Sequence, residues 1–184
     1  MIETERLKLI PLERRHLPQL RQLRLDFSTW HYLTDAHPIN DLQQEKWFEK
    51  ISCDPTKMYF AIEVPTTGNV SMLPSYVFGG IIRADEYDKT NRSIRVGVDI
   101  VSSSRGNGYG TEALKGFINY LFQHLNIHRV WLLVAQPNIV AKNLYNKIGF
   151  TSEGAYREAL FRDGEWLDYE IMSLLSTKWK ANTK

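Results

Sequence analysis

The stretch Ile94–Thr111, IRVGVDIVSSSRGNGYGT, decides the fold. It opens with a β-branched run, Ile94–Val101, and ends in a glycine-rich loop, Arg105–Thr111, after which apolar residues recur at helical steps. The pattern predicts a strand, a turn and a helix. Glycine permits positive φ and has no Cβ, so successive backbone N–H groups in the turn converge. Together with the positive end of a helix they predict an anion site, most often for phosphate.

The residues of the loop leave several interpretations open. A tight strand-to-helix turn without a ligand is the simplest. A dinucleotide-binding loop needs a third glycine at the position of Thr111, and a Walker phosphate loop needs a lysine directly after Gly110. Neither pattern is complete, so the loop alone predicts a turn or an anion site of another kind.

A second patterned stretch follows the apolar strand predicted at Val130–Ala135. It reads Asn138-x-x-Ala141-x-x-Leu144-Tyr145-x-Lys147-x-Gly149-Phe150. This stretch, and the earlier Arg105-x-x-Gly108-x-Gly110, resemble the two signature motifs of the GNAT superfamily of N-acetyltransferases, in the same order. The resemblance covers nearly the whole chain and is strongest from about 94 to 150.

The resemblance implies the GNAT fold, an α+β (α/β-like) domain over residues 1–184. We expect a single mixed, mostly antiparallel sheet of about seven strands with a splayed central parallel pair, flanked by about four helices. The donor-site core covers about 94–150, the acceptor-side helices about 15–52, and a C-terminal hairpin about 151–177. The first strand and the hairpin resemble the RimJ/RimL-like branch, the ribosomal-protein alanine N-acetyltransferase type.

Two segments are expected to lack regular structure. Asp85–Arg92 is polar and is interpreted as a connection between strands, and the charged tail from Lys178 is expected to fray. Gly79 and Gly80 lie within an otherwise apolar strand and predict a bulge or a close backbone approach.

Composition sets the class of protein. Hydrophobic residues make up 43% of the 184 positions, which is enough for a core, and the net charge is only +2. We therefore expect no nucleic-acid partner and, without a long apolar run, no membrane partner. The single cysteine rules out an internal disulfide and fits a reducing, cytoplasmic location. A monomer or homodimer is expected, with acetyl-CoA as cosubstrate and no metal.

The resemblance also assigns roles at the donor site. The backbone at the end of the first central strand would bind the pantetheine arm, the loop N–H groups would hold the pyrophosphate, and Arg105 would add charge beside it. Asn138 would contact the donor or cap its helix. The expected donor-binding residues are Ile100, Val101, Arg105, Gly106, Asn107, Gly108, Tyr109, Gly110, Thr111, Asn138 and Asn143.

Tyr145 is the expected catalytic residue, because it matches the tyrosine that protonates the leaving thiolate in many members of the family. A phenol with a pKa near 10 can stabilise or protonate a thiolate. The usual glutamate bases are missing, because their positions hold Arg95 and Leu133. Strand alternation would aim Asp99 away from the cleft, which leaves the general base unassigned.

The expected function is transfer of acetyl from acetyl-CoA to a primary amine by direct attack on the thioester. Neutralising a lysine-like amine at pH 7 costs about 4.6 kcal/mol, but an α-amine costs only about 1 kcal/mol. The missing base therefore favours a protein N-terminal α-amine. The alternatives are a small-molecule amine (a polyamine, amino sugar or antibiotic) and a non-catalytic acyl-CoA-binding module.

Overall fold

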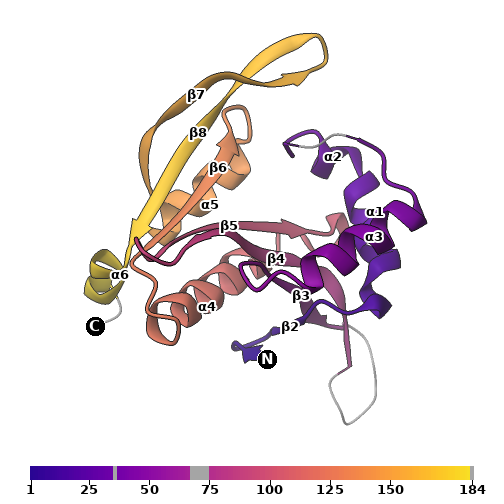
Figure 1. The fold of residues 1–184 in the computed structure, drawn as a ribbon, viewed down its shortest axis with the longest axis horizontal. Coiled ribbons are helices and arrows are strands. Elements are labelled where there is room, and N and C mark those ends of the chain that lie inside the picture. Colours follow the sequence, from indigo (N-terminus) through magenta and orange to yellow (C-terminus); the bar gives the residue numbers. More distant parts are fainter. Residues whose placement is uncertain (35–36, 67–74, 183–184) are drawn as a thin grey trace.

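The computed structural model describes residues 1–34, 37–66 and 75–182, which form one eight-stranded sheet with helices on its faces (Figure 1). The strand order is β1-β2-β3-β4-β5-β6-β8-β7. The strands are β1 (Ile2–Glu3), β2 (Lys8–Pro11), β3 (Met58–Pro65), β4 (Tyr76–Asp88), β5 (Ser93–Ile100), β6 (Arg129–Ala135), β7 (Thr151–Arg162) and β8 (Glu165–Leu175). The helices are η1 (Arg14–His16), α1 (Leu17–Leu25), α2 (Phe27–Trp30), α3 (Asp41–Ser52), η2 (Ser102–Ser104), α4 (Tyr109–Gln123), α5 (Ile139–Ile148) and α6 (Ser176–Asn182).

The sheet is covered on both faces. Side chains alternate along a strand, so neighbouring residues enter different cores. Ile82 packs in one core with Phe117 of α4, whereas Ile81 packs in the other with Leu20 of α1. The acceptor-side helices α1 and α3 thus lie opposite α4. All pairings are antiparallel except β5 with β6, which confirms the expected mixed α+β fold.

The parallel pair separates after a short contact. β5 and β6 pair only at Ser93–Arg129, Ile94–Val130 and Arg95–Trp131, although both strands continue well beyond. Helix α4 provides the crossover that a parallel pair requires. A gap therefore opens between the two central strands, as expected.

Backbone geometry defines three local features, of which the bulge was predicted from Gly79 and Gly80. Ile62 pairs with Gly80 and Glu63 with Phe78, so Gly79 is the extra residue of a β-bulge. Asn40 caps α3 in a capping box with Gln43. The hairpin of β7 and β8 turns at Asp163-Gly164, which have φ of 52° and 85°, the positive values of a type I′ turn.

The expected sheet of about seven strands has eight, because Ile2 and Glu3 of β1 pair with Leu9 and Lys8. Two other expectations were wrong in detail. Residues 85–88 continue β4 rather than forming a connection, because Asp85 pairs across the ladder with Arg95. The tail is not frayed up to Asn182, since α6 places the Trp179 ring 6.2 Å from Phe122 and buries it.

The C-terminal hairpin reaches back to the segment that follows α2. Arg162 donates from Nε to the His31 carbonyl at 2.9 Å and also bonds the Leu33 carbonyl, and Tyr169 donates to the Tyr32 carbonyl at 3.2 Å. In Figure 1 the hairpin extends over the end of the molecule that carries α2. None of the described helices is long and apolar enough to cross a membrane.

We predict that α6 stabilises the domain through its tryptophan. Trp179→Ala removes a buried ring from the core, so the free energy of unfolding should fall by about 3–5 kcal/mol in chemical denaturation. Leu42→Ala is the control, because Leu42 is 64% exposed on α3 and its removal should cost less than about 0.5 kcal/mol. A loss at Trp179 no larger than that of the control would contradict the packing of α6.

Candidate active site

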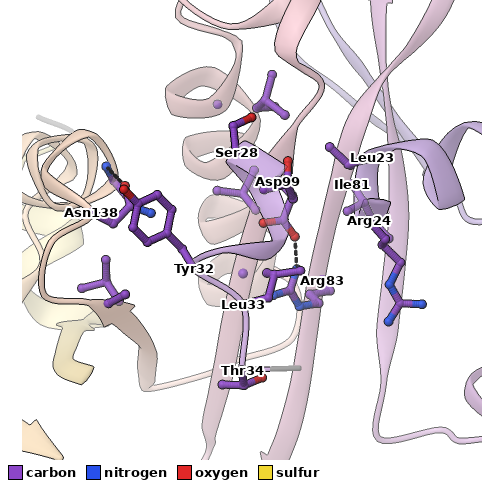
Figure 2. Close-up of a pocket in the computed structure, with 18 of the residues that line it drawn as sticks. Leu23, Arg24, Ser28, Tyr32, Leu33, Thr34, Ile81, Arg83, Asp99 and Asn138 are labelled. Atoms are coloured by element: carbon purple, nitrogen blue, oxygen red, sulfur yellow. Dashed lines mark hydrogen bonds and ion pairs between the residues drawn. The ribbon is translucent and has the colours of Figure 1, made fainter. Parts of the chain in front are cut away.

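The gap between the central strands is part of a cavity of about 930 Å³. Its walls come from β4, β5, β6, the loop before α4, and the helices α1, α2, α3 and α5. Figure 2 shows part of this lining, with Arg24, Tyr32, Arg83, Asp99 and Asn138 around the cavity. The two stretches that carry the sequence motifs therefore meet the acceptor-side helices at one site.

The glycine loop has the backbone of an anion site. Gly106 and Gly108 have φ of 81° and 79°, which favours glycine. Gly108 is the N-cap of α4, and the first bond into the helix is from Glu112 N–H to the Gly108 carbonyl, at 3.1 Å. The N–H groups of residues 109–111 therefore have no acceptor within the helix and lie at the positive end of its dipole.

Arg6 is a second cation at the loop, and its role was missed in the sequence. Its guanidinium lies 4.8 Å from the Tyr109 ring centroid and donates to the Asn107 carbonyl at 3.1 Å. Glu112 accepts from Arg6 Nε at 2.7 Å and from Thr4 Oγ1 at 2.6 Å. The N-terminal segment thus holds the start of α4, an arrangement that no sequence motif signals.

Arg105 has a different orientation from the one expected. Its Nε donates to the Ile100 carbonyl at 2.9 Å, and its terminal nitrogens donate to Ser28 Oγ at 2.6 Å and Thr29 Oγ1 at 2.7 Å. The guanidinium is therefore directed toward α2 and the end of β5 rather than toward the phosphate loop. It ties the acceptor-side helix α2 to the donor side of the cavity.

The backbone of β5 divides its hydrogen bonds between the two sides of the strand. Val101 donates to the Gly79 carbonyl at 2.9 Å, so its N–H is already used by β4. Hydrogen-bonding groups alternate along an antiparallel strand, so Ile100 and Val98 direct theirs toward the gap beside β6. Ile100 and Val98 thus direct hydrogen-bonding groups toward the gap, where the Ile100 carbonyl accepts from Arg105, whereas the Val101 N–H is bonded to β4.

The second motif contributes a buried phenol. Tyr145 lies on α5, lines the cavity and is 7% exposed. Burial raises the pKa of Tyr145 to about 12, and the charge of Asp99 adds to the shift while Arg83 opposes it. The phenol is therefore protonated at neutral pH, and its O–H can donate a hydrogen bond.

The cavity brings together most, but not all, of the expected residues. Asn138 lines it, and its side chain accepts from Ala141 N–H at 3.1 Å, so it caps α5. Val101, Asn107 and Asn143 do not line it, and Asn143 is exposed on α5. The expected residues that line the cavity are Ile100, Arg105, Gly106, Gly108, Tyr109, Gly110, Thr111, Asn138 and Tyr145.

A charged strip runs along β4 and β5 inside the cavity, and it was also missed. Arg83 donates to Asp99 at 2.5 Å, the contact dashed in Figure 2. Arg95 donates to both carboxylate oxygens of Asp85, at 2.7 and 3.2 Å. A Cβ at Gly97 would lie 2.7 Å from the Arg83 guanidinium carbon, so glycine leaves the space in which Arg83 crosses β5.

The charged strip shows that the expected orientation of Asp99 was wrong. It also explains why no general base is assigned. Asp99 faces the cavity, because β5 places it on the same side as Arg95 and Gly97. Each of the two cavity aspartates is nevertheless engaged by an arginine. A sequence signal existed: charged residues stand at alternate positions 83 and 85 on one strand and 95 and 99 on the next, which indicates a polar face on a buried sheet.

Several known proteins resemble this chain in sequence. Residues 6–151 match the family model described as an acetyltransferase (GNAT) domain. A putative ribosomal N-acetyltransferase, YdaF, of Bacillus subtilis is 32% identical over 102 residues, 55% of this chain and 56% of YdaF. The chain thus spans little more than half of that relative. The spermidine N(1)-acetyltransferase of Escherichia coli K12 is 24% identical over 177 residues, 96% of this chain and 90% of that protein.

A solved structure shares the whole fold. The spermidine N-acetyltransferase of Vibrio cholerae, in complex with CoA and spermine, superposes with a TM-score of 0.83 at 26% identity, over 95% of this chain and 98% of that one. These relatives include both a ribosomal and a spermidine type, so they do not single out the RimJ/RimL-like branch. The match over residues 6–151, together with the splayed strands and the glycine loop, places the chain in the GNAT family of acetyltransferases.

Proposed function

We propose that this protein transfers the acetyl group of acetyl-CoA to the amine of a small molecule. The observation that carries the proposal is the meeting of three features in one cavity: the N–H groups at the start of α4, the gap between β5 and β6, and the buried phenol of Tyr145. The first suits a pyrophosphate, the second an extended pantetheine arm, and the third a leaving thiolate.

The chemistry follows from the positions of these groups. The neutral amine nitrogen attacks the thioester carbonyl carbon, the C–S bond breaks, and the proton released by the amine balances the one gained by the thiolate. Full transfer of the Tyr145 proton to the thiolate, whose thiol has a pKa near 8.5, is uphill, since the phenol has a pKa of about 12. Tyr145 therefore acts by donating a hydrogen bond to the departing sulfur.

A small acceptor is favoured over the protein N-terminus expected from the sequence. Relatives that align over most of their length include proteins named for spermidine. The hairpin bonds from Arg162 and Tyr169 to the backbone of residues 31–33 also bridge the acceptor side of the cavity, which restricts a long chain. The rival is an acyl-CoA-binding module without catalysis, and Tyr145 argues against it because a binder needs no thiolate partner.

We predict that the glycine loop binds the phosphates of acetyl-CoA. Gly106→Asp puts a negative charge into the loop, at a position where an added Cβ meets nothing within 4 Å. Gly106→Asn has the same shape without the charge, and both residues tolerate positive φ. Acetyl-CoA and CoA should raise the melting temperature of the wild type and of Gly106→Asn, whereas Gly106→Asp should lose this shift.

The same measurement with NAD and ATP tests selectivity. Neither nucleotide should stabilise the protein as acetyl-CoA does. An equal shift with ATP or NAD, or an unchanged acetyl-CoA shift in Gly106→Asp, would count against the donor site.

We predict that Tyr145→Phe lowers kcat but preserves acetyl-CoA binding. A hydrogen bond to a charged group is worth about 1.5–3 kcal/mol, so kcat should fall about 10- to 150-fold. CoA release, measured with a thiol reagent, gives the rate, and the thermal shift gives binding. An unchanged kcat would remove Tyr145 from the mechanism and favour the binding module.

We predict a rate that rises from pH 7 to 10 in both forms. The acceptor loses its proton over this range, while the phenol keeps its own because its pKa is about 12. The profile of Tyr145→Phe should therefore have the same shape at a lower level. A falling limb below pH 10 that is present only in the wild type would contradict the raised pKa.

A further inference from the structure

We propose that Asp99 is a catalytic residue whose second carboxylate oxygen, Oδ1, accepts a hydrogen bond from the acceptor amine during attack. This inference rests on the proposed function and assigns one more residue of the same cavity to the reaction. In this role Asp99 acts on the attacking nitrogen, whereas Tyr145 acts on the departing sulfur.

Asp99 lies where the donor and acceptor sides of the cavity meet. On β5 it stands between Val98 and Ile100, which direct backbone groups toward the gap beside β6. It pairs across the ladder with Ile81, whose side chain packs in one core with Leu20 of α1. Cross-strand partners share a face of the sheet, so the Asp99 carboxylate lies on the face that carries the acceptor-side helices. Its backbone thus borders the donor gap and its side chain borders the acceptor space.

One oxygen of the Asp99 carboxylate can accept a further hydrogen bond. Arg83 Nη1 donates to Oδ2 at 2.5 Å, the contact dashed in Figure 2. Among the described residues, Arg83 is the only hydrogen-bond or ion-pair partner of this carboxylate. Oδ1 remains accessible, and the side chain is 20% exposed in the cavity wall. A carboxylate has lone pairs for several donors, so the bond to Arg83 leaves Oδ1 available.

The neighbouring carboxylates are engaged more completely. Asp85, the other described aspartate of the cavity lining, accepts from Arg95 at both oxygens, at 2.7 and 3.2 Å. Two carboxylates that adjoin the lining also have partners: Glu86 contacts Arg95 at 2.8 Å, and Asp26 accepts from Ser28 N–H at 2.8 Å. Of the described carboxylates that line the cavity, only Asp99 therefore offers an oxygen to an amine.

Asp99 is also close to the group that meets the sulfur. Both residues line the cavity, Asp99 from β5 and Tyr145 from α5. The charge of Asp99 contributes to the raised pKa of Tyr145, so the carboxylate and the phenol interact across the cavity. During transfer the nitrogen and the sulfur are bonded to the same carbon. Groups that bind these two atoms must therefore be neighbours, as Asp99 and Tyr145 are.

The assisted step is the attack of the neutral amine on the thioester. An N–H bond of the amine points to Asp99 Oδ1, while its lone pair forms the C–N bond and the carbonyl π pair moves to oxygen. No proton moves in this step, so positive charge develops on the nitrogen beside the carboxylate, which stabilises it. The nitrogen then loses its extra proton to solvent, and the electron pair returns from oxygen as the C–S bond breaks.

Arg83 fixes the carboxylate for this step. It lies across β5 in the space left at Gly97 and binds Oδ2, which sets the direction of Oδ1. It also compensates part of the negative charge of Asp99, so the amine is held by a local hydrogen bond rather than by the net charge of the cavity. Asp99 differs from a glutamate base at the positions of Arg95 or Leu133, because it takes no proton.

Two substitutions of Asp99 test the inference. Asp99→Asn keeps the shape without the charge, and Asp99→Ala removes the group. Loss of a charged hydrogen bond in the transition state should lower kcat/KM about 10- to 150-fold in both variants. The rate of CoA release is measured with spermidine, phenethylamine and glucosamine as acceptors.

Asp41→Asn is the matched control for these variants. Asp41 is an exposed aspartate on α3 that also pairs with an arginine, Arg21, at 3.2 Å, but outside the cavity lining. Its substitution should leave kcat/KM within about twofold of the wild type. A value for Asp99→Asn within the same about twofold range would overturn the inference.

Added formate separates a chemical role of Asp99 from a structural one. Asp99→Ala leaves a space in which formate can place a carboxylate beside the amine. Sodium formate should therefore restore part of the lost kcat/KM in Asp99→Ala and should not raise that of the wild type or Asp41→Asn. A rate of Asp99→Ala that formate leaves unchanged means that Asp99 only supports the cavity wall, and the inference is then wrong.

The failure of the proposed function has a separate signature. In that case acetyl-CoA gives the wild type no thermal shift, or none of the three amines releases CoA from it. If the inference holds, both Asp99 variants keep the acetyl-CoA shift of the wild type, because Asp99 binds the acceptor. A shift lost in both variants, with the wild type active, would make Asp99 a residue of the donor site and overturn only the inference.

Discussion

The separation of β5 from β6 is the constraint on which the rest of the structure depends. Three paired positions hold the two strands together at one end, and beyond Arg95 and Trp131 they diverge. Backbone N–H and C=O groups that would pair in a continuous sheet therefore face a gap. The same divergence brings the start of α4 and the buried face of α5 to one cavity, because each helix adjoins one of the separated strands. Without it the glycine loop would be a turn beside a closed sheet.

The contacts around the gap couple its donor and acceptor sides. Arg105 stands at the end of β5 but donates to Ser28 and Thr29 of α2. The hairpin side chain Arg162 reaches the backbone after α2 from the other direction. The short helix α2 is therefore held by residues distant in sequence, and its position depends on the donor loop and the hairpin together.

The charged strip depends on the space left by the missing side chain of Gly97. Because Gly97 has no Cβ, Arg83 can lie across β5 and reach Asp99. Burial by itself lowers the pKa of Arg83, but the charge and hydrogen bond of Asp99 outweigh it and the pKa lies above its ordinary value. The strip thus remains charged in the cavity, with two arginines paired to two aspartates.

Much of the fold and the donor loop follows from the sequence alone. Apolar periodicity predicted the strands and helices, and the two motifs predicted the anion site and Tyr145, because these depend on residues close together in the chain. Only the tertiary structure decided in which direction the long side chains point and which of them form pairs. Arg105 donates hydrogen bonds to α2, and the Val101 N–H donates to β4. The Trp179 side chain is buried, and Arg83 and Arg95 pair with the two cavity aspartates. Such contacts join residues that are distant in the chain, and the free energy of each depends on burial and on partners that local sequence does not specify.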